Sequence, residues 1–263
     1  MPQFFDKAGD RLVYLAQAAS SEFWDGQWRK LDIERVARTV NHFVQRWTRR
    51  YLPAGSRVLE GGCGMGGNVH TLQRAGYDCY GIDYAAETVA GINRVAPDLK
   101  VTEGDVRALP FADGFFDGYW SLGVIEHFFD GFEPIRDEMA RVIRPGGFLF
   151  LTFPTFSPLR RWKALRGAYP PFIDTPESRA AFYQFALSPR AVGQSFAAAG
   201  FSLRSAVGFD ATKGLKDEVP CLNGPLRAIS RRGNPLTRTV ARGLEITGAG
   251  LAPHMSLLVL KRV

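Results

Sequence analysis

The sequence predicts an α/β fold in which helices cover both faces of a parallel sheet, and three observations support this. The glycine-rich stretch VLEGGCGMGGN, residues 58–68, joins a β-rich run to a helical run, as in a loop that cradles a ligand. β-rich and helical runs then alternate as far as residue 154. The run GFLFLTFP, residues 147–154, is apolar without alternation, which is typical of a strand buried on both faces.

The expected elements follow one another in a regular order. Residues 32–51 carry apolar side chains at helical spacing and predict an N-terminal helix that closes at Leu52-Pro53. A short strand then leads into the glycine loop, and the helix after the loop ends at Gly76. The remaining expected elements are strands at 77–84, 99–105, 116–124 and 147–154, and helices at 85–97 and 133–144.

Composition narrows the class of protein. A chain of 263 residues that is 46% hydrophobic can bury an ordinary core, so we expect one catalytic domain with additions. The N-terminus lacks a secretory pattern and no apolar run is long enough to span a bilayer, which predicts a cytoplasmic protein. The cysteines, Cys63, Cys79 and Cys221, and the histidines show no metal-ligand spacing, so we expect no metal. A net charge of +7 suits nucleic acid, an anionic small molecule or a membrane surface alike.

The glycine loop alone fits two cofactors. Gly62, Gly64 and Gly67 satisfy the dinucleotide-binding pattern, and Asp83 lies where such a fold places its ribose carboxylate. Glu60 separates the two cases, because a carboxylate at the end of the first strand repels the diphosphate of NAD but suits a ligand with an ammonium and a sulfonium group. The residues therefore favour S-adenosylmethionine, with Asp83 accepting hydrogen bonds from the ribose hydroxyls. A helix N-cap is the alternative role for Asp83.

The third strand ends in EGDVRALPF, which supplies a candidate adenine site. Asp105 can accept a proton from the adenine amino group, and the backbone N–H of Val106 can donate to the ring. Taken alone, Asp105 also fits a turn before Leu109-Pro110. Its position one strand beyond Asp83 favours the adenine role.

Several motifs in register resemble class I S-adenosylmethionine-dependent methyltransferases, particularly the branch with small-molecule and quinone methyltransferases. The motifs are VLEGGCGMGG, GIDY, EGDVRALPF, FDGYWSLGVIEHF and ARVIRPGGFLFLTFP, covering residues 57–154, with weaker likeness in residues 187–209 and 254–263. The resemblance implies a Rossmann-like, doubly wound, seven-stranded sheet whose last strand is antiparallel. It also implies S-adenosylmethionine as cofactor and S-adenosylhomocysteine as product. Glu60 departs slightly, since Asp is also frequent in the family at its position.

The resemblance also implies roles for individual residues, by their position in the motifs. Those expected to meet the methionyl part are Glu60, Gly61, Gly62 and Gly64, with Asn68 in the same cofactor site. Asp83 and Tyr84 would meet the ribose and adenine, and Asp105 and Val106 the adenine. Ser121, Leu122 and Gly123 would form the floor near the sulfonium.

Residues outside the shared core are expected to form a gate and a lid. The domain division is an N-terminal helical segment at 1–52 and the methyltransferase domain at 53–263. In EFWDGQWRK, Trp28 and its aromatic neighbours would close over the cofactor and Arg29 would pair with its carboxylate, or this stretch would only anchor the segment to the core. Insertions at 155–187 and 211–253, rich in basic residues, would cover the acceptor, and contact of these basic segments with a membrane surface is left open.

The predicted reaction is methyl transfer to a small molecule, with oxygen as the preferred acceptor atom and nitrogen or carbon as the alternatives. The acceptor would be anionic or aromatic. His127 is the candidate base because its ordinary pKa lies near neutrality and it follows the fourth strand, although a histidine held structurally by a neighbour such as Glu126 is the alternative. Rival functions are methylation of a lipid-linked or glycan acceptor at a membrane, and RNA modification or nucleic-acid binding. No RNA-binding module is evident, so no stable nucleic-acid partner is expected.

Overall fold

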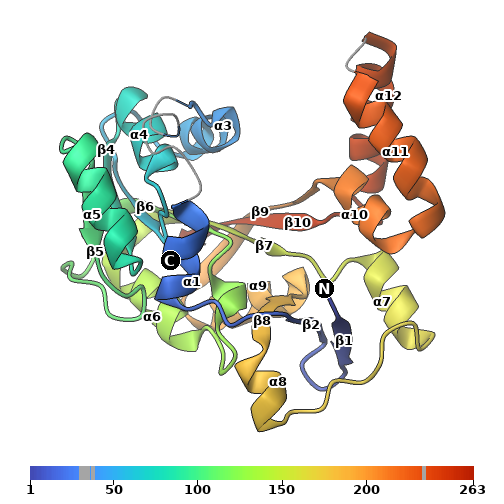
Figure 1. The fold of residues 1–263 in the computed structure, drawn as a ribbon. Helices are drawn as coiled ribbons and strands as arrows, with labels where there is room; N and C mark the ends of the chain where they lie inside the picture. The colour runs from blue at the N-terminus through green and yellow to red at the C-terminus, as the bar shows by residue number, and fades with distance from the viewer. Residues whose placement is uncertain (30–35, 37–38, 233–234) are drawn as a thin grey trace.

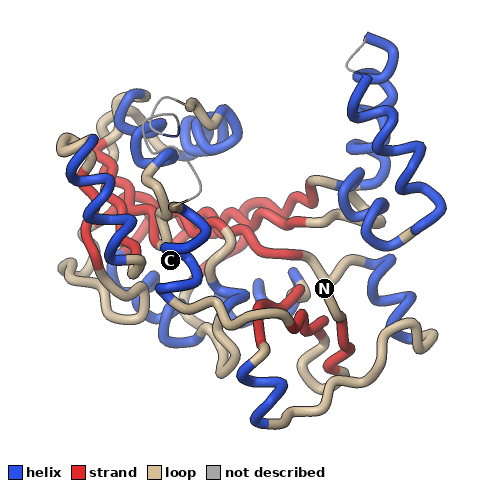
Figure 2. Tube along the Cα trace, viewed as in Figure 1, coloured by secondary structure: helices blue, strands red, loops and turns tan. Residues whose placement is uncertain are grey.

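A computed structural model of the chain, which describes residues 1–29, 36, 39–232 and 235–263, contains a seven-stranded main sheet. Figures 1 and 2 show it running through the middle of the molecule. The strand order is β5-β4-β3-β6-β7-β10-β9; β3 to β7 run parallel, and β10 is antiparallel to both of its neighbours. The strands are β3 (Arg57–Gly61), β4 (Asp78–Asp83), β5 (Lys100–Glu103), β6 (Phe116–Leu122), β7 (Ile143–Pro154), β9 (Phe201–Phe209) and β10 (Met255–Arg262). The predicted doubly wound sheet with an antiparallel last strand is confirmed.

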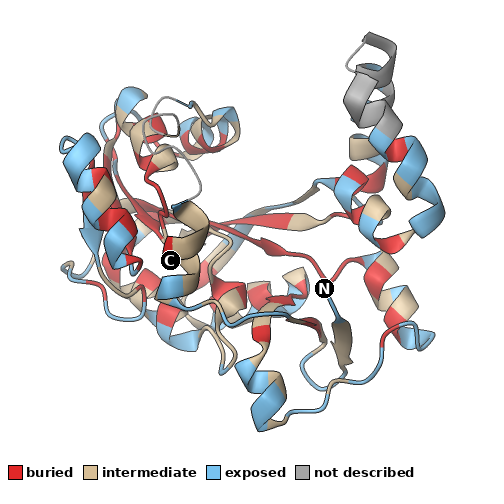
Figure 3. Ribbon diagram, in the orientation of Figure 1, coloured by how far each residue is buried: buried red, intermediate tan, exposed pale blue. Residues whose placement is uncertain are grey.

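Helices cover the sheet on both faces because successive strand residues point to opposite sides. Val58 packs into one apolar core, with the helices α3 (His42–Tyr51), α4 (Gly67–Arg74) and α5 (Ala86–Val95). Leu59 packs into the other, with α6 (Glu133–Val142) and α9 (Pro189–Ala198). Buried residues accordingly concentrate along the strands and the inner sides of the helices (Figure 3). Both faces of the main sheet are therefore shielded from water by helices, which explains the continuous apolar runs in the sequence.

Asn41 begins the helix α3 and links it to the glycine loop. Its side-chain oxygen accepts hydrogen bonds from the backbone N–H groups of Phe43 and Val44, at 3.1 and 3.3 Å. Its amide nitrogen donates to Oδ1 of Asn68 at 2.8 Å. The first part of the predicted helix over 32–51 lies outside the described residues, and the described α3 begins later than Asp32.

The N-terminus differs from the predicted helical segment. The strands β1 (Gln3–Asp6) and β2 (Arg11–Leu15) form a hairpin, and β8 (Phe182–Ala186) pairs with β2 to complete a three-stranded antiparallel sheet. The helix α1 (Ser21–Trp28) follows, with Ser20 as its N-cap. Residues 1–52 are therefore not helical throughout, and their hairpin is part of one sheet with the end of the first predicted insertion.

The two insertions contact each other through a buried ionic cluster. The first contains α7 (Pro158–Leu165) and α8 (Pro176–Ala180), and the second contains α10 (Ala211–Glu218), α11 (Pro220–Arg232) and α12 (Pro235–Gly248). Glu218 accepts hydrogen bonds from Nε of Arg160 at 2.8 Å, from Nζ of Lys163 at 2.7 Å and from the hydroxyl of Tyr169. Burial would raise the pKa of Glu218, but the hydrogen bonds from Lys163, Tyr169 and Arg160 lower it below its ordinary value.

Replacing Glu218 with glutamine is expected to destabilise the fold by about 3 kcal/mol at neutral pH, because the buried Arg160 would lose the carboxylate 2.8 Å away and keep only Asp217 at 4.0 Å. Since the pKa of Glu218 is lowered by folding, its contribution is complete above the ordinary value of 4.5 and is lost at lower pH. Urea unfolding at pH 7 and pH 4 measures both effects. Glu103→Gln, at an exposed position on β5, is the matched control, and an equal loss in both variants would contradict the buried pairing.

Candidate functional site

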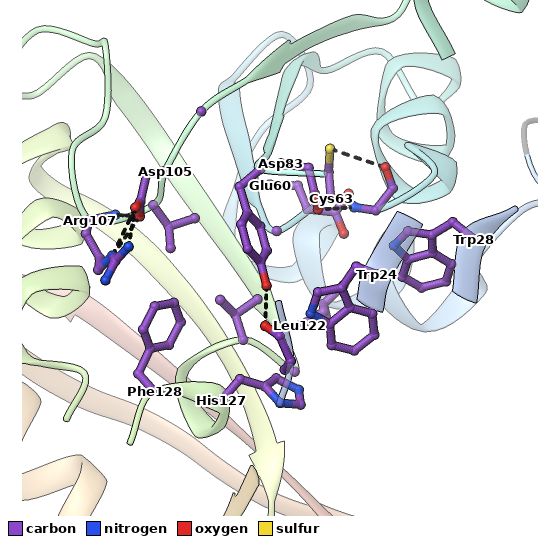
Figure 4. Close-up of a pocket in the computed structure, with 18 of the residues that line it drawn as sticks. Trp24, Trp28, Glu60, Cys63, Asp83, Asp105, Arg107, Leu122, His127 and Phe128 are labelled. Carbon is purple, nitrogen blue, oxygen red and sulfur yellow. Dashed lines mark hydrogen bonds and ion pairs between the residues drawn. The ribbon is translucent and has the colours of Figure 1, made fainter. Parts of the chain in front are cut away.

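A cavity of about 400 Å³ opens where β3, β4 and β6 end at the same edge of the main sheet. This is the edge at which open parallel α/β sheets bind ligands, and the volume lies in the usual range for a ligand site. Figure 4 shows the aromatic and carboxylate side chains that surround it. The predicted residues that line it are Trp28, Glu60, Gly62, Gly64, Asn68, Asp83, Tyr84, Asp105, Val106, Leu122, Gly123 and His127. Their roles toward a cofactor stay predictions.

The glycine loop turns tightly around the carbonyl of Ile82. The N–H groups of Gly62 and Cys63 both donate to that carbonyl, at 2.8 and 3.1 Å. Gly62 and Gly64 have φ angles of 72° and 50°, a left-handed conformation that favours glycine. A Cβ on Gly62 would also lie 2.6 Å from Cγ2 of Val124. The loop thus brings bare backbone to the cavity wall.

Gly61 and Ser121 do not line the cavity, although both were expected in the cofactor site. A Cβ on Gly61 would collide with the hydroxyl of Tyr119, so this glycine makes room for a core side chain rather than for a ligand. Ser121 is fully buried within β6. The residues that follow Ser121, Leu122 and Gly123, do reach the cavity. The resemblance located the ends of the strands, but it did not indicate which residues at these ends line the cavity and which are buried in the core.

Glu60 presents an unsatisfied carboxyl oxygen at the cavity. Its side chain is 1% exposed, and Oε1 accepts a hydrogen bond from Nδ2 of Asn68 at 2.7 Å. Oε2 has no hydrogen-bond partner within the described part of the chain. Burial raises the pKa of Glu60 to about 8, and neighbouring Asp83 adds to the rise. A cationic group in the cavity would supply the missing partner and favour the charged carboxylate.

Affinity for a cationic ligand is expected to rise with pH between about 6 and 8. The free protein holds Glu60 protonated at neutral pH, whereas a bound cation lowers its pKa, so binding releases a proton. Titration calorimetry with S-adenosylmethionine in buffers of different ionisation enthalpy measures this release. Glu60→Gln should abolish the proton release and weaken binding roughly tenfold or more, and proton release that persists in this variant would refute the assignment.

Asp83 holds the glycine loop and the start of α5. Its Oδ2 accepts a hydrogen bond from the N–H of Gly64 at 2.7 Å, and its Oδ1 accepts one from the N–H of Ala85 at 2.9 Å. The N-cap of α5 is Ala85, so Asp83 is not the cap that the alternative reading proposed. Each carboxylate oxygen keeps a second lone pair. The side chain can therefore fix the loop and accept hydrogen bonds from a ligand at the same time.

Asp105 reaches the cavity but is bound by Arg107, a residue that the sequence interpretation missed. Nε and Nη2 of Arg107 donate to the carboxylate at 2.6 to 3.0 Å, and the Arg107 backbone N–H donates to it at 2.8 Å. Hydrogen bonds from Arg107 lower the pKa of Asp105 although burial opposes them. Arg107 itself lines the cavity. An aspartate with an arginine two residues later is the sequence signal that could have indicated this pair.

His127 lies on the cavity wall with a defined orientation. It belongs to the short 3₁₀ segment η1 (Ile125–His127), and its Nδ1 lies 2.7 Å from the backbone carbonyl of Tyr183 on β8. Because a carbonyl only accepts, Nδ1 carries the hydrogen and Nε2 holds the lone pair in the neutral ring. Burial lowers the pKa of His127 below its ordinary value of 6.5, although the bond to Tyr183 opposes the shift. The neutral form is thus the main one at neutral pH.

The helix α1 forms one side of the cavity. The rings of Trp24 and Trp28 stack with their centroids 5.8 Å apart. The ring of Trp24 packs edge-to-face with that of His127, with the centroids 5.2 Å apart. Oδ1 of Asp25 accepts hydrogen bonds from the N–H and hydroxyl of Thr88, at 2.9 and 2.6 Å, and so anchors α1 to α5. The segment is therefore anchored to the core beside the cavity, and its closure over a cofactor stays a prediction.

Arg29 and the second insertion differ from the expectation. The guanidinium of Arg29 pairs with Glu87 on the exposed surface, and Arg29 does not line the cavity. No described residue of 211–253 lines the cavity either, and α11 and α12 project away from it (Figure 1). The insertion at 155–187 comes closer, because Tyr183 contacts His127. A lid built from both insertions is therefore not what the structure shows.

A second groove, of about 590 Å³, lies next to the cavity and shares the two tryptophans of α1 with it. Its aromatic walls are Phe23, Trp24, Trp28 and Tyr183, and Met1, Ala16, Gln17 and Gln27 complete it. Trp24 and Trp28 line both spaces. Trp24 and Tyr183, which line the groove, both contact His127, which lines the cavity.

Metal ligands and membrane spans were sought in the described ranges. Within them, no group of three or more His, Cys, Asp or Glu side chains is arranged to hold a metal ion. Every helix in these ranges is too short or too polar to cross a lipid bilayer.

The sheet order, the glycine loop and the carboxylates of Glu60 and Asp83 at one cavity agree with the features that the sequence resemblance predicted. Residues 59–151 match a family described as a methyltransferase domain. This match covers about a third of the chain and agrees with the resemblance to class I S-adenosylmethionine-dependent methyltransferases. A probable S-adenosylmethionine-dependent methyltransferase of Mycolicibacterium smegmatis is 36% identical over 41% of this chain and 42% of the relative. A demethylmenaquinone methyltransferase of Beutenbergia cavernae is 34% identical over 51% and 58%. The chain thus spans about half the length of these relatives.

Solved structures share the fold over most of the chain. The [4+2]-cyclase SpnF superposes with a TM-score of 0.58 at 16% identity, over 95% of this chain and 98% of that one. Geranyl diphosphate C-methyltransferase from Streptomyces coelicolor, solved with S-adenosylhomocysteine, superposes with a TM-score of 0.54 at 18% identity, over 83% and 75%. At these identities the likeness concerns the fold alone.

Proposed function

We propose that the protein transfers a methyl group from S-adenosylmethionine to a small-molecule acceptor. The observation that carries the proposal is the buried Oε2 of Glu60, which no described residue hydrogen-bonds, beside a glycine loop that Asp83 fixes. Bound S-adenosylmethionine supplies a methyl group on a positive sulfonium, which is a leaving group that needs no protonation. Glu60 would hold the cationic methionyl end, and Asp83 would accept the ribose hydroxyls.

The acceptor would enter through the aromatic groove and meet the cavity at His127. Flat aromatic walls favour a planar, largely apolar acceptor, and the relatives of this chain include demethylmenaquinone and hydroquinone methyltransferases. We place the transfer at an acceptor oxygen. Nε2 of His127 would take the hydroxyl proton as the oxygen attacks the methyl carbon in line. The tryptophans of α1 would exclude water and offer a π-face to positive charge.

Two other functions have a specific motive. The cyclase among the structural neighbours supports a different reaction on the same fold. The residual similarity of the loop to the dinucleotide-binding pattern supports NAD, whose diphosphate Glu60 would repel only in its charged form.

Parallel calorimetric titrations with S-adenosylmethionine, S-adenosylhomocysteine and NAD test the proposal. We expect binding of the first two and none of NAD. Production of S-adenosylhomocysteine in the presence of hydroquinones and catechols then tests the transfer. Binding of NAD alone would overturn the cofactor assignment. Binding of S-adenosylmethionine without turnover across acceptors, with conversion of a polyene substrate, would favour the cyclase.

A further inference from the structure

The helix α7 exposes apolar side chains and buries a charged one, which is the reverse of an ordinary surface helix. Surface helices bury an apolar stripe and expose their charges. In α7, however, Arg160 is 1% exposed, whereas Trp162 is 52% exposed and Leu165 is 74% exposed. Pro158, Trp162, Leu165 and Arg166 follow one another at the i, i+4, i+7 and i+8 spacing, so they share one face of the helix, and all four are exposed. The outward face of α7 is therefore apolar.

The ionic cluster with α10 explains this orientation. Arg160 and Lys163 must face Glu218, because their side chains donate to its carboxylate at 2.8 and 2.7 Å. Rotating the helix to bury Trp162 would break these bonds and leave the buried Glu218 without its cationic partners. The apolar face is consequently held toward solvent by interactions that are costly to lose.

Further exposed groups lie beside this face. Arg166 places its guanidinium 4.5 Å from the centre of the Trp162 ring. At the start of the helix, the N–H of Leu159 donates to the carbonyl of Leu251 at 3.0 Å, and Leu251 is exposed. We call Trp162, Leu165, Arg166 and Leu251 the α7 surface. It combines an indole, two aliphatic side chains and a cation.

The net charge of the chain is concentrated in the same two insertions. Residues 155–187 and 211–253 contain twelve Lys and Arg and five Asp and Glu, a net charge of +7. This equals the charge of the whole chain, so the remaining residues are neutral in sum. The segments that carry the outward apolar face are thus the segments that attract anions.

We propose that the α7 surface docks the protein on an anionic lipid bilayer. Tryptophan prefers the membrane interface, aliphatic side chains enter the acyl boundary, and Lys and Arg gain from anionic headgroups. A nucleic acid would also attract the positive charge, but exposed leucines give it no contact that it can use. The proposal concerns recruitment alone and does not depend on the reaction.

Sedimentation with lipid vesicles tests the proposal. The full chain is mixed with neutral phosphatidylcholine vesicles or with vesicles that also contain phosphatidylglycerol, at low salt and at 0.15 M salt. We expect binding to the anionic vesicles only, weakened by salt. Trp162→Ser/Leu165→Ser should lower the partition constant roughly tenfold or more. Val95→Ser/Leu203→Ser removes two exposed hydrophobic residues outside the insertions and should bind like the wild type.

The alternatives give different results. Absence of vesicle binding by the wild type, or equal losses in the two double variants, would overturn the α7 surface as a membrane contact. A gel shift with RNA at 0.15 M salt, without vesicle binding, would assign the charge to a nucleic acid instead. S-adenosylhomocysteine affinity should be unchanged in Trp162→Ser/Leu165→Ser, which separates this test from that of the proposed reaction.

Discussion

Replacing Asp83 with alanine is expected to weaken S-adenosylmethionine binding by about 10²- to 10⁴-fold. The cofactor would lose two hydrogen bonds to a charged acceptor, each contributing about 1.5–3 kcal/mol. The loop itself would also suffer, because the N–H groups of Gly64 and Ala85 lose their buried acceptor. We therefore expect a free energy of unfolding lower by about 2 kcal/mol as well. Calorimetry and urea unfolding measure the two effects separately.

Two variants make the Asp83 result specific. Asp83→Asn keeps one acceptor oxygen and the shape of the side chain, so its affinity should lie between those of wild type and Asp83→Ala. Asp78→Ala removes a carboxylate at the other end of the same strand, where it pairs with Lys100, and should leave the affinity unchanged. Wild-type affinity in a folded Asp83→Ala protein would remove the ribose assignment.

The shared core was predictable because its signals are local. Apolar periodicity and the glycine loop each specify their element from neighbouring residues, and the sheet confirms the resulting order. The carboxylates at strand ends were predictable for the same reason, because parallel strands end at one edge of the sheet. Glu60 and Asp83 accordingly reach one cavity from neighbouring strands.

The remaining features depend on distant partners. The β1–β2 hairpin pairs with β8, more than 160 residues further along the chain, and no local pattern announces that pairing. Arg29 was expected inside the cavity, but Glu87 on α5 pairs with it on the surface. The orientation of α7 also depends on a distant partner. Its apolar stripe suggests a buried face, but Glu218 pairs with the charged side chains on the opposite side of the helix. Ion pairs between residues far apart in the sequence therefore determine the positions of Arg29 and α7, which helical periodicity does not predict.

Replacing His127 with alanine is expected to lower kcat by about 10²- to 10⁴-fold while leaving cofactor affinity nearly unchanged. Its Nδ1–H is held by the Tyr183 carbonyl, so Nε2 can take a proton without a change of tautomer. The measurement is steady-state turnover with a hydroxyl acceptor found by the screen, beside calorimetry with S-adenosylhomocysteine. His127→Gln should also lose activity, because an amide cannot serve as a base at neutral pH.

The pH profile distinguishes a base from a merely structural histidine. Burial lowers the pKa of His127, so kcat/KM for the acceptor, measured at saturating S-adenosylmethionine, should rise with pH, reach half its plateau below pH 6.5 and stay level above it. If His127 is only structural, the rise of kcat/KM with pH should persist in His127→Gln. If His127 is the base, this rise should disappear in the variant together with most of the activity. His70, whose pKa is also lowered by burial, lies on α4 away from the cavity lining, and His70→Gln is the control that should keep the wild-type profile. Full activity in His127→Gln would mean that the acceptor ionises unaided and that alignment by the aromatic walls supplies the catalysis.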